Sequence, residues 1–455
     1  MTTNNERQSA AVAVIAVPLP AQGHLNQMLQ LSSLISSHGV PVYYAGSALH
    51  NRQARSRINA LNPQDVARIN FHDFPIPPFL SPPPNPNSTN KFPTQLAPAT
   101  EATLSLRGPF AAYLEQMAHK FTRVVVIHDP LMSYVVQDVA EIPNAESYRF
   151  VCISAFSHIS FICGALGLPF PVPHPKELPP YEGWTSETAP KFFAIQAKPS
   201  EIRSGNIFNT SRLIEGPYME VIEREELKKG RPSWAIGPIL PTSSRSNDSH
   251  ECLEWLDKQE EKSVIYVSFG TTVSLSDKEI NELAHGLERS RVKFLWVLRD
   301  ADKGDVFDGD VRRAELPEGF GENGMVVREW APQPQILGHP SIGGFMTHCG
   351  WNSCVESVTA GVPMAAWPMH SDQPRNAALV ADILKTGIVV REWKDRFELV
   401  KASRIENVVR RLMASEEGKE MRKTAEELSA AVRRATDPGG ASRIELDSFI
   451  AHITR

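Results

Sequence analysis

Residues Trp330–Gln373, WAPQPQILGHPSIGGFMTHCGWNSCVESVTAGVPMAAWPMHSDQ, decide the fold of the second half of this chain. An apolar strand predicted over Gly344–Thr347 runs through a glycine-containing turn into the start of a helix. Such a turn aims unpaired backbone N–H groups, and the positive end of the helix dipole, into a crevice. The segment therefore predicts an α/β protein with an anion site, and phosphate is the anion expected there.

The side chains around this turn suit a sugar nucleotide. His348 offers a ring donor, Gly350 and Ser353 are small, and Glu356 places a carboxylate one helical turn further on. A second interpretation stays open, because Ser353-Cys354-Val355-Glu356 also fits the S-x-x-E capping box. From the residues alone, Glu356 is as well explained as a helix cap as a ligand, and the tryptophans as core aromatics.

Length and composition describe an ordinary globular protein. The 455 residues suffice for two domains, and the formal net charge of −5 is small for that length. The chain has no basic run interleaved with aromatics, so no nucleic-acid partner is expected. Its five cysteines are scattered without C-x-x-C spacing, which predicts neither a disulfide framework nor structural zinc.

The termini predict a cytoplasmic protein without a membrane segment. The N-terminus, MTTNNERQSA, lacks the basic flank of a signal peptide, and the apolar run that follows it reads as a first buried strand. No stretch of about 18 apolar residues occurs. A monomer is expected.

Both halves of the chain alternate short β-branched runs with amphipathic helical spacing. This pattern predicts parallel sheets covered on both faces, hence two Rossmann-like domains facing a cleft. The polar, turn-rich Pro238–His250 separates them, so we predict an N-terminal domain over 1–240, a linker over 241–250 and a second domain from 251. The predicted strands are Val12–Val17, Val40–Ala45, Val124–Ile127 and Phe150–Ser154, then Val264–Phe269, Phe294–Leu298, Met325–Val327, Gly344–Thr347, Met364–Trp367 and Ile388–Val390.

Two proline-rich loops, Pro75–Pro86 and Leu168–Pro180, cannot be regular structure but are stiffer than Gly/Ser linkers. Loops beyond the carboxyl ends of strands build ligand sites in α/β domains, so these loops are candidate walls of a second pocket. The alternative is that they are surface loops without a ligand. The aromatic candidates are Phe74, Phe79, Phe92, Phe170 and Trp184.

Two polar residues follow predicted strands of the first sheet. His24 ends Pro18–His24, PLPAQGH, at the opening of the first helix, and Asp129 follows the strand Val124–Ile127. Both should emerge at one sheet edge, facing the cleft. Taken alone, His24 is more readily explained as a helix cap or a packed residue, and Asp129 as the cap of the following helix.

The 44 residues of Trp330–Gln373 resemble the signature segment of the plant UDP-sugar-dependent glycosyltransferases, and the likeness extends over the whole chain. The resemblance implies the GT-B arrangement, with the second domain ending at 438 and residues 439–455 forming a helix that returns to the first domain. It implies a UDP-glucose site in which Trp330 stacks on uracil, Glu356 accepts from the ribose, and Asp372 and Gln373 bind the sugar. The remaining implied contacts are Ala331 and Gln333 near the base and ribose, His348, Gly350, Asn352, Ser353 and Thr271 at the diphosphate, and Trp351 beside the sugar.

The same resemblance implies that His24 is a general base oriented by Asp129, in an inverting transfer without a protein nucleophile. No cofactor is implied, since UDP-glucose is a co-substrate. Asp308-Gly309-Asp310 superficially matches a metal-binding D-x-D motif. We interpret it, with Asp300, Asp302 and Asp305, as a solvated acidic loop, and expect metal-independent activity.

Several segments, including Ile127–Met132 and Trp296–Asp305, are most similar to the zeatin (cytokinin) O-glucosyltransferases within that family. The implied acceptor is a small plant hydroxyl compound, a zeatin-type cytokinin first, with a flavonoid or other phenolic acceptor, or UDP-xylose as donor, as alternatives. A non-catalytic nucleotide-sugar-binding protein is a remote alternative, against which His24 and Asp129 argue. A nicotinamide oxidoreductase is disfavoured because no G-x-G-x-x-G follows the first strand.

Overall fold

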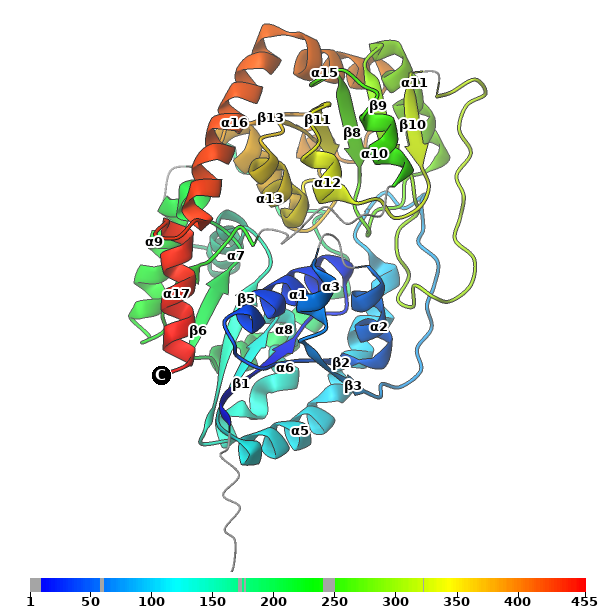
Figure 1. The fold of residues 1–455 in the computed structure, drawn as a ribbon. Helices are drawn as coiled ribbons and strands as arrows, with labels where there is room; N and C mark the ends of the chain where they lie inside the picture. Colours follow the sequence, from blue (N-terminus) through cyan, green and yellow to red (C-terminus); the bar gives the residue numbers. More distant parts are fainter. Residues whose placement is uncertain (1–9, 58–60, 171–173, 176, 240–249, 322) are drawn as a thin grey trace, which may run out of the picture.

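The computed structural model describes residues 10–57, 61–170, 174–175, 177–239, 250–321 and 323–455. In these residues two parallel sheets form, one in each half of the chain, and helices cover them (Figure 1). The predicted α/β class with two parallel sheets is confirmed.

The first sheet has the strand order β3-β2-β1-β4-β5-β6-β7, and every neighbouring pair is parallel. Strand order reverses between β1 and β4, so the loops after these two strands diverge and leave a crevice between them. The strands are β1 Ala10–Val17, β2 Val42–Ser47, β3 Asn70–Phe74, β4 Phe121–His128, β5 Ala145–Val151, β6 Gly205–Phe208 and β7 Ser233–Ala235.

The second sheet repeats this plan with the order β10-β9-β8-β11-β12-β13, again entirely parallel. Its reversal point lies between β8 and β11, and β11 is the strand that the signature segment predicts. The strands are β8 Val264–Ser268, β9 Lys293–Val297, β10 Gly324–Val327, β11 Ile342–Thr347, β12 Met364–Ala366 and β13 Gly387–Val389.

The helices cover both faces of each sheet, and four clusters of buried apolar side chains lie between helices and strands. The α-helices are α1 Gln22–Ser37, α2 Ala48–Ser56, α3 Pro63–Val66, α4 Ala97–Ala102, α5 Arg107–Lys120, α6 Ser133–Val136, α7 Ala155–Leu166, α8 Ala189–Ala197, α9 Arg212–Leu227, α10 Glu251–Leu256, α11 Asp277–Ser290, α12 Gln333–Leu337, α13 Trp351–Ala360, α14 Gln373–Ala378, α15 Ala402–Ala414, α16 Glu416–Thr436 and α17 Ala441–Ile453.

The last helix, α17, packs against the first sheet rather than the second (Figure 1). Phe449 of α17 contacts the rings of Tyr148 on β5 and Trp234 on β7. Glu445 of α17 also accepts a hydrogen bond from the backbone N–H of Ala235. The C-terminal helix thus joins the hydrophobic core of the first half. The predicted linker 241–250 lies outside the described residues, except for His250.

The sequence predicts β1, β2, β4, β5 and β8 to β13, but the bounds of β2 and β5 are shifted. Predicted Val40–Ala45 is observed at Val42–Ser47, and predicted Phe150–Ser154 is observed earlier, at Ala145–Val151. Strands β3, β6 and β7 were not predicted, because they are short and contain polar residues such as Asn70 and Asn206. Such short segments carry little hydrophobic periodicity, whether they lie at the sheet edge, as β3 and β7 do, or inside the sheet, as β6 does.

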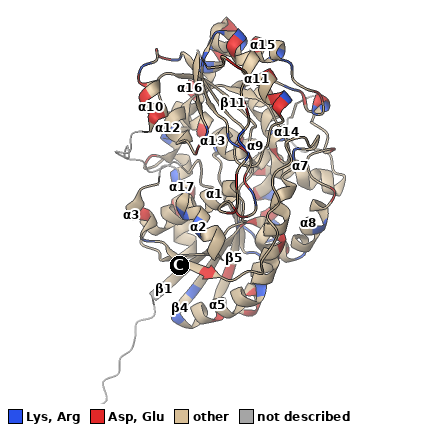
Figure 2. Ribbon diagram, turned by 90° about the vertical axis from the view of Figure 1, so that its right-hand side faces the viewer, with Lys and Arg blue, Asp and Glu red and all other residues tan. Residues whose placement is uncertain are grey.

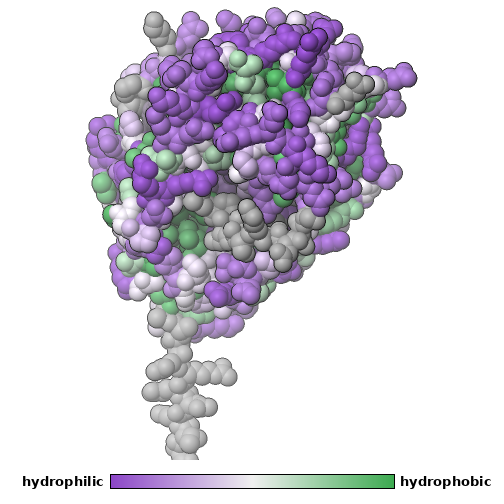
Figure 3. All heavy atoms as spheres, turned by 45° about the horizontal axis from the view of Figure 1, so that its top comes forward, coloured by the Kyte–Doolittle hydropathy of each residue, from purple (hydrophilic) through white to green (hydrophobic). Residues whose placement is uncertain are grey.

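The surface is mixed in charge and mainly hydrophilic. Lys and Arg alternate with Asp and Glu over the helices (Figure 2), and the face over the second half is largely polar with small apolar areas (Figure 3). Within the described residues, no helix combines the length and apolar character that crossing a bilayer requires.

Candidate active site

His24 and Asp129 meet at the reversal point of the first sheet. His24 is the third residue of α1, just after β1, and Asp129 directly follows β4. Asp129 Oδ2 lies 2.6 Å from His24 Nδ1, while Asp129 Oδ1 accepts a hydrogen bond from the backbone N–H of Leu131. Asp129 is therefore both the cap of a short 3₁₀ helix, Pro130–Met132, and the partner of His24.

The surroundings of this pair favour the protonated imidazole. Burial lowers the pKa of His24, but the Asp129 carboxylate, in hydrogen-bond contact, and Asp372, further away, together raise the pKa above 6.5. Asp129 is 2 % exposed at its side chain and His24 28 %. The carboxylate is thus held away from water, whereas the histidine ring remains accessible to a molecule in the crevice. Because a raised pKa makes the neutral ring a stronger proton acceptor, this arrangement suits an oriented general base.

Cys152, which follows β5, brings a thiol beside the same pair. Donor atoms of His24, Asp129 and Cys152 all lie within 4.8 Å of one another, a spacing that a metal ion could bridge. Burial and the neighbouring Asp129 raise the pKa of the Cys152 thiol well above its ordinary value. Cys152 is therefore a neutral, buried thiol beside the His24–Asp129 pair.

The second reversal point presents the start of α13. Cys349 adopts a left-handed conformation (φ 64°) at the turn from β11, and the side chain of His348 is held between two glycines. A Cβ at Gly350 would lie 2.6 Å from His348 Nε2, and one at Gly270 2.5 Å from His348 Cε1. Burial lowers the pKa of His348 to about 4, so this ring is a neutral N–H donor beside the helix N-terminus.

Two residues of α13 bond directly to the first half of the chain. Asn352 Nδ2 donates to the backbone oxygen of Gly23, the residue before His24, at 2.8 Å. Trp351 Nε1 donates to the backbone oxygen of Asn209 at 2.9 Å, and the Trp351 side chain is buried. The segment that carries His24 and the predicted diphosphate site are therefore joined by a direct hydrogen bond.

Gln333, Ser353 and Glu356 come together on α12 and α13. Gln333 Nε2 donates to Glu356 Oε2 at 2.7 Å and to Ser353 Oγ at 3.1 Å. Helix α13 begins at Trp351 with Gly350 as its N-cap, so Ser353 and Glu356 lie inside the helix. The capping-box interpretation of Glu356 is wrong. Burial raises the pKa of Glu356 to about 7, although the hydrogen bond from Gln333 acts in the opposite direction.

Asp372, one of the two predicted sugar-binding residues, is held by a residue that was not predicted. Asn376 is fully buried, and its amide nitrogen donates to Asp372 Oδ2 and to the backbone oxygen of Cys349. Its amide oxygen accepts from Ser154 and Ser157, at the start of α7 in the first half. The i, i+4 spacing from Asp372 was a readable signal. Burial raises the pKa of Asp372 to about 6.

The remaining predicted residues lie around these groups. Gln373 is buried and its Oε1 accepts from the backbone N–H groups of Met369 and His370. Ala331 is buried and follows Trp330, which is half-buried. The ring of Trp330 lies near two arginines, Arg57 and Arg299. Thr271 follows β8 at the second reversal point. The predicted site residues thus lie at the two reversal points, on or directly before α12 and α14, and on α13.

One aromatic candidate for a pocket wall is wrong. Phe74 is only 5 % exposed and packs edge-on against Phe110 and Tyr113 in the core, because it ends β3 and faces α5. Phe92 lies near His370, and Trp184 stacks on Phe161 of α7, both at the junction of the halves. Phe79 packs near Gly304, and Phe170 contacts Phe156 and Tyr218.

The interpretation of the acidic segment as a solvated loop is wrong in part. Asp308 and Asp310 are exposed, but Asp300 and Asp302 are buried. Asp302 forms ion pairs with Arg57 and Arg299, and Asp300 accepts a hydrogen bond from Ser274. Ion pairing compensates the cost of burying Asp302, and the Ser274 hydroxyl bonds to Asp300. Arg299 lies three residues before Asp302, but Arg57 is 245 positions away, so the local pattern of charges could not identify this second partner.

Known proteins resemble this chain over its whole length. Residues 10–241 match the model "Glycosyltransferase, N-terminal domain", and residues 238–429 match "UDP-glucoronosyl and UDP-glucosyl transferase". The chain is 50 % identical to zeatin O-xylosyltransferase of Phaseolus vulgaris (100 % of both chains covered) and 50 % identical to zeatin O-glucosyltransferase of Phaseolus lunatus (98 % and 97 %). Its fold matches Phytolacca americana UGT2, solved with UDP-2fluoro-glucose and pterostilbene, at 25 % identity and a TM-score of 0.74 (98 % and 100 %). This chain belongs to the UDP-glycosyltransferase family and is a UDP-glycosyltransferase.

Proposed function

We propose that the protein transfers glucose from UDP-glucose to a hydroxyl of a small plant metabolite, with a zeatin-type cytokinin as the acceptor. The observation that carries this proposal is the hydrogen-bonded His24–Asp129 pair, joined through Gly23 to Asn352 at the start of α13. A base from one half faces an anion site in the other. The acceptor follows from the two relatives that act on zeatin.

In the proposed reaction, His24 Nε2 takes the proton of the acceptor hydroxyl while that oxygen attacks the anomeric carbon. The new C–O bond forms on the face opposite UDP, the bond to the β-phosphate breaks, and an α-linked donor becomes a β-glucoside. Asp129 orients the imidazole and stabilises the imidazolium without taking the proton. Charge growing on the diphosphate is stabilised by His348, Asn352 and the helix N-terminus.

UDP-xylose is a second candidate donor. The observation that favours it is that a zeatin O-xylosyltransferase and a zeatin O-glucosyltransferase are equally similar to this chain, at 50 % identity. Asp372 and Gln373 are proposed to bind hydroxyls that both sugars share. The buried network around them has no described feature that excludes the smaller pentose.

The test is a mass-shift screen of the purified protein. UDP-glucose and UDP-xylose are each supplied with trans-zeatin, cis-zeatin, a flavonol and a simple phenol. A gain of one hexose on a zeatin, with the glycoside shown to be β by nuclear magnetic resonance, is the expected result. Product on the flavonol or phenol alone would reject the acceptor assignment, and a pentose gain would identify xylose as the donor.

We also propose that turnover needs no divalent metal. The side chains proposed at the diphosphate site, such as His348 and Asn352, are hydrogen-bond donors rather than acidic metal ligands. Of the nearby acidic residues, Asp300 accepts a hydrogen bond from Ser274, and Asp302 forms ion pairs with Arg57 and Arg299. The initial rate should be unchanged when the protein is treated with EDTA. A rate lost with EDTA and restored by magnesium would overturn metal independence. The free cysteines, all buried, are compatible with the proposed cytoplasmic monomer.

A further inference from the structure

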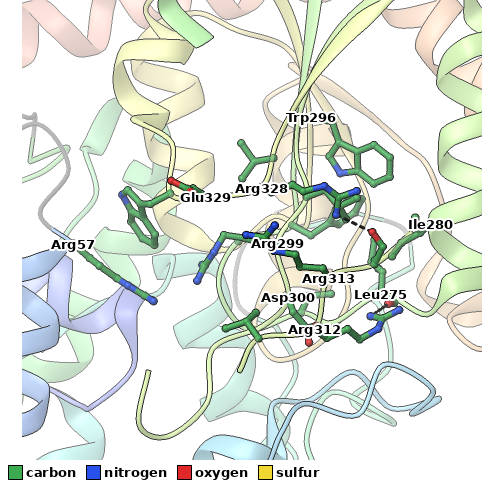
Figure 4. A pocket seen from close by; sticks show the side chains of 18 residues that line it. Arg57, Leu275, Ile280, Trp296, Arg299, Asp300, Arg312, Arg313, Arg328 and Glu329 are labelled. Carbon is green, nitrogen blue, oxygen red and sulfur yellow. Dashed lines mark hydrogen bonds between the residues drawn. The ribbon is translucent and has the colours of Figure 1, made fainter. Parts of the chain in front are cut away.

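A cavity of about 250 Å³ lies in the second half of the molecule (Figure 4). Trp330, the residue expected to stack on uracil, is part of its lining. The lining combines apolar side chains, such as Val273, Ile280 and Trp296, with charged ones, among them Arg57 and Arg299. The guanidinium carbons of Arg57 and Arg299 lie 5.3 Å and 5.4 Å from the centre of the Trp330 ring. Arginine groups from both halves of the chain therefore converge at this indole.

Asp302 divides its two oxygens between these arginines. Arg299 Nη2 donates to Asp302 Oδ1 at 2.7 Å, and Arg57 Nη1 donates to Asp302 Oδ2 at 2.6 Å. A carboxylate that faces one arginine alone commonly takes two parallel hydrogen bonds from it. Here the second oxygen is already used by Arg57, so Asp302 holds Arg299 through only one nitrogen.

The other terminal nitrogen of Arg299, Nη1, is buried and has no hydrogen-bond partner among the described residues. Both oxygens of Asp302 already accept from other nitrogens, and the backbone of Asp302 is fixed by hydrogen bonds to Thr271 and from Gln95. A buried guanidinium nitrogen without an acceptor is unfavourable, and an incoming acceptor would relieve that cost. A ligand that places a hydrogen-bond acceptor, such as a carbonyl oxygen, beside the Trp330 ring would supply the partner that Arg299 Nη1 lacks.

Resting on the proposed function, we propose that Arg299 Nη1 donates a hydrogen bond to a carbonyl oxygen of the uracil ring of the donor. A base stacked on Trp330 lies roughly 3.5–4 Å from the indole, so its edge comes within reach of a guanidinium group at this distance. Uracil carries two carbonyl oxygens on its ring edge. Arg299 binds the base directly, whereas Asp302 and Arg57 are positioning residues that keep one nitrogen of Arg299 available.

Calorimetric titration of the purified protein tests this contact with two probes, UDP and ribose 5-diphosphate, which lacks the base. Arg299→Ala should raise the Kd for UDP about tenfold or more and change the Kd for ribose 5-diphosphate by less than about twofold. The matched control is Arg313→Ala, which removes an exposed arginine from the same cavity wall. It should leave both Kd values unchanged.

Equal losses for both probes in Arg299→Ala, or equal losses of UDP affinity in the Arg299 and Arg313 variants, would overturn the base contact. If Arg299→Ala does not fold, Arg299→Lys keeps the charge but not the planar fork, and should still lose UDP affinity selectively. An unaltered UDP affinity in Arg299→Lys would then refute the proposal. These titrations need no acceptor, so failure to glucosylate zeatin and failure of the base contact are separate results.

Discussion

Replacing His24 by alanine is expected to lower kcat by about 10²–10⁴, the usual contribution of a general base. In the proposed reaction the proton of the acceptor hydroxyl moves to His24 Nε2, while Asp129 holds the other ring nitrogen, Nδ1. The alanine variant has no group in this place to take the proton. UDP affinity should change little, because the proposed donor contacts come from the second half. Steady-state kinetics and UDP titration together measure both quantities.

The matched control is His285→Ala, which removes an exposed histidine of α11 and should leave kcat unaltered. The wild-type pH profile gives a second check. Since the Asp129 and Asp372 carboxylates raise the pKa of His24, activity should fall as the pH drops through a value above 6.5. Undiminished turnover in His24→Ala would remove this residue from the reaction.

Replacing Glu356 by alanine is expected to weaken UDP and UDP-glucose alike, by about 10- to 100-fold. A hydrogen bond to a charged acceptor is worth about 1.5–3 kcal/mol, and the proposed ribose contact loses at least one. Because burial raises the pKa of Glu356 to about 7, the fully charged acceptor is present only above that pH. UDP affinity of the wild type should therefore increase as the pH rises through about 7.

Glu427→Ala, at an exposed position of α16, is the control and should bind UDP normally. Glu356→Gln retains the size of the side chain and tests the charge alone. If Glu356→Ala lowers only the melting temperature and leaves the Kd for UDP unchanged, Glu356 has a structural role through Gln333 and no role in ribose binding.

The candidate site was largely readable from local sequence in the second half. Trp330 to Gln373 are contiguous, so β11, the turn at Cys349 and the start of α13 follow from one short pattern. The position of Glu356 inside that helix was not decided by this pattern. Whether Ser353 begins the helix or lies within it depends on where the backbone turns, and that turn lies at the left-handed Cys349, with Gly350 as the N-cap.

Contacts between distant segments were not readable. Asn376 was missed although it lies four residues after Asp372, since only the fold brings Ser154 and Ser157 to its amide oxygen. The buried state of Asp302 was missed for the same reason. A run of aspartates resembles a solvated loop until Arg57, from the other half of the chain, pairs with one of them.

The sequence by itself determined the alternation of strands and helices, the two parallel sheets and the polar residues that follow their central strands, because hydrophobic periodicity and turn residues act over a few positions. The tertiary structure alone decided which of these residues meet. His24 and Asp129 are 105 positions apart and touch only because strand order reverses between β1 and β4. Pairing of strands and packing of the two halves are long-range events, and no local pattern encodes their partners.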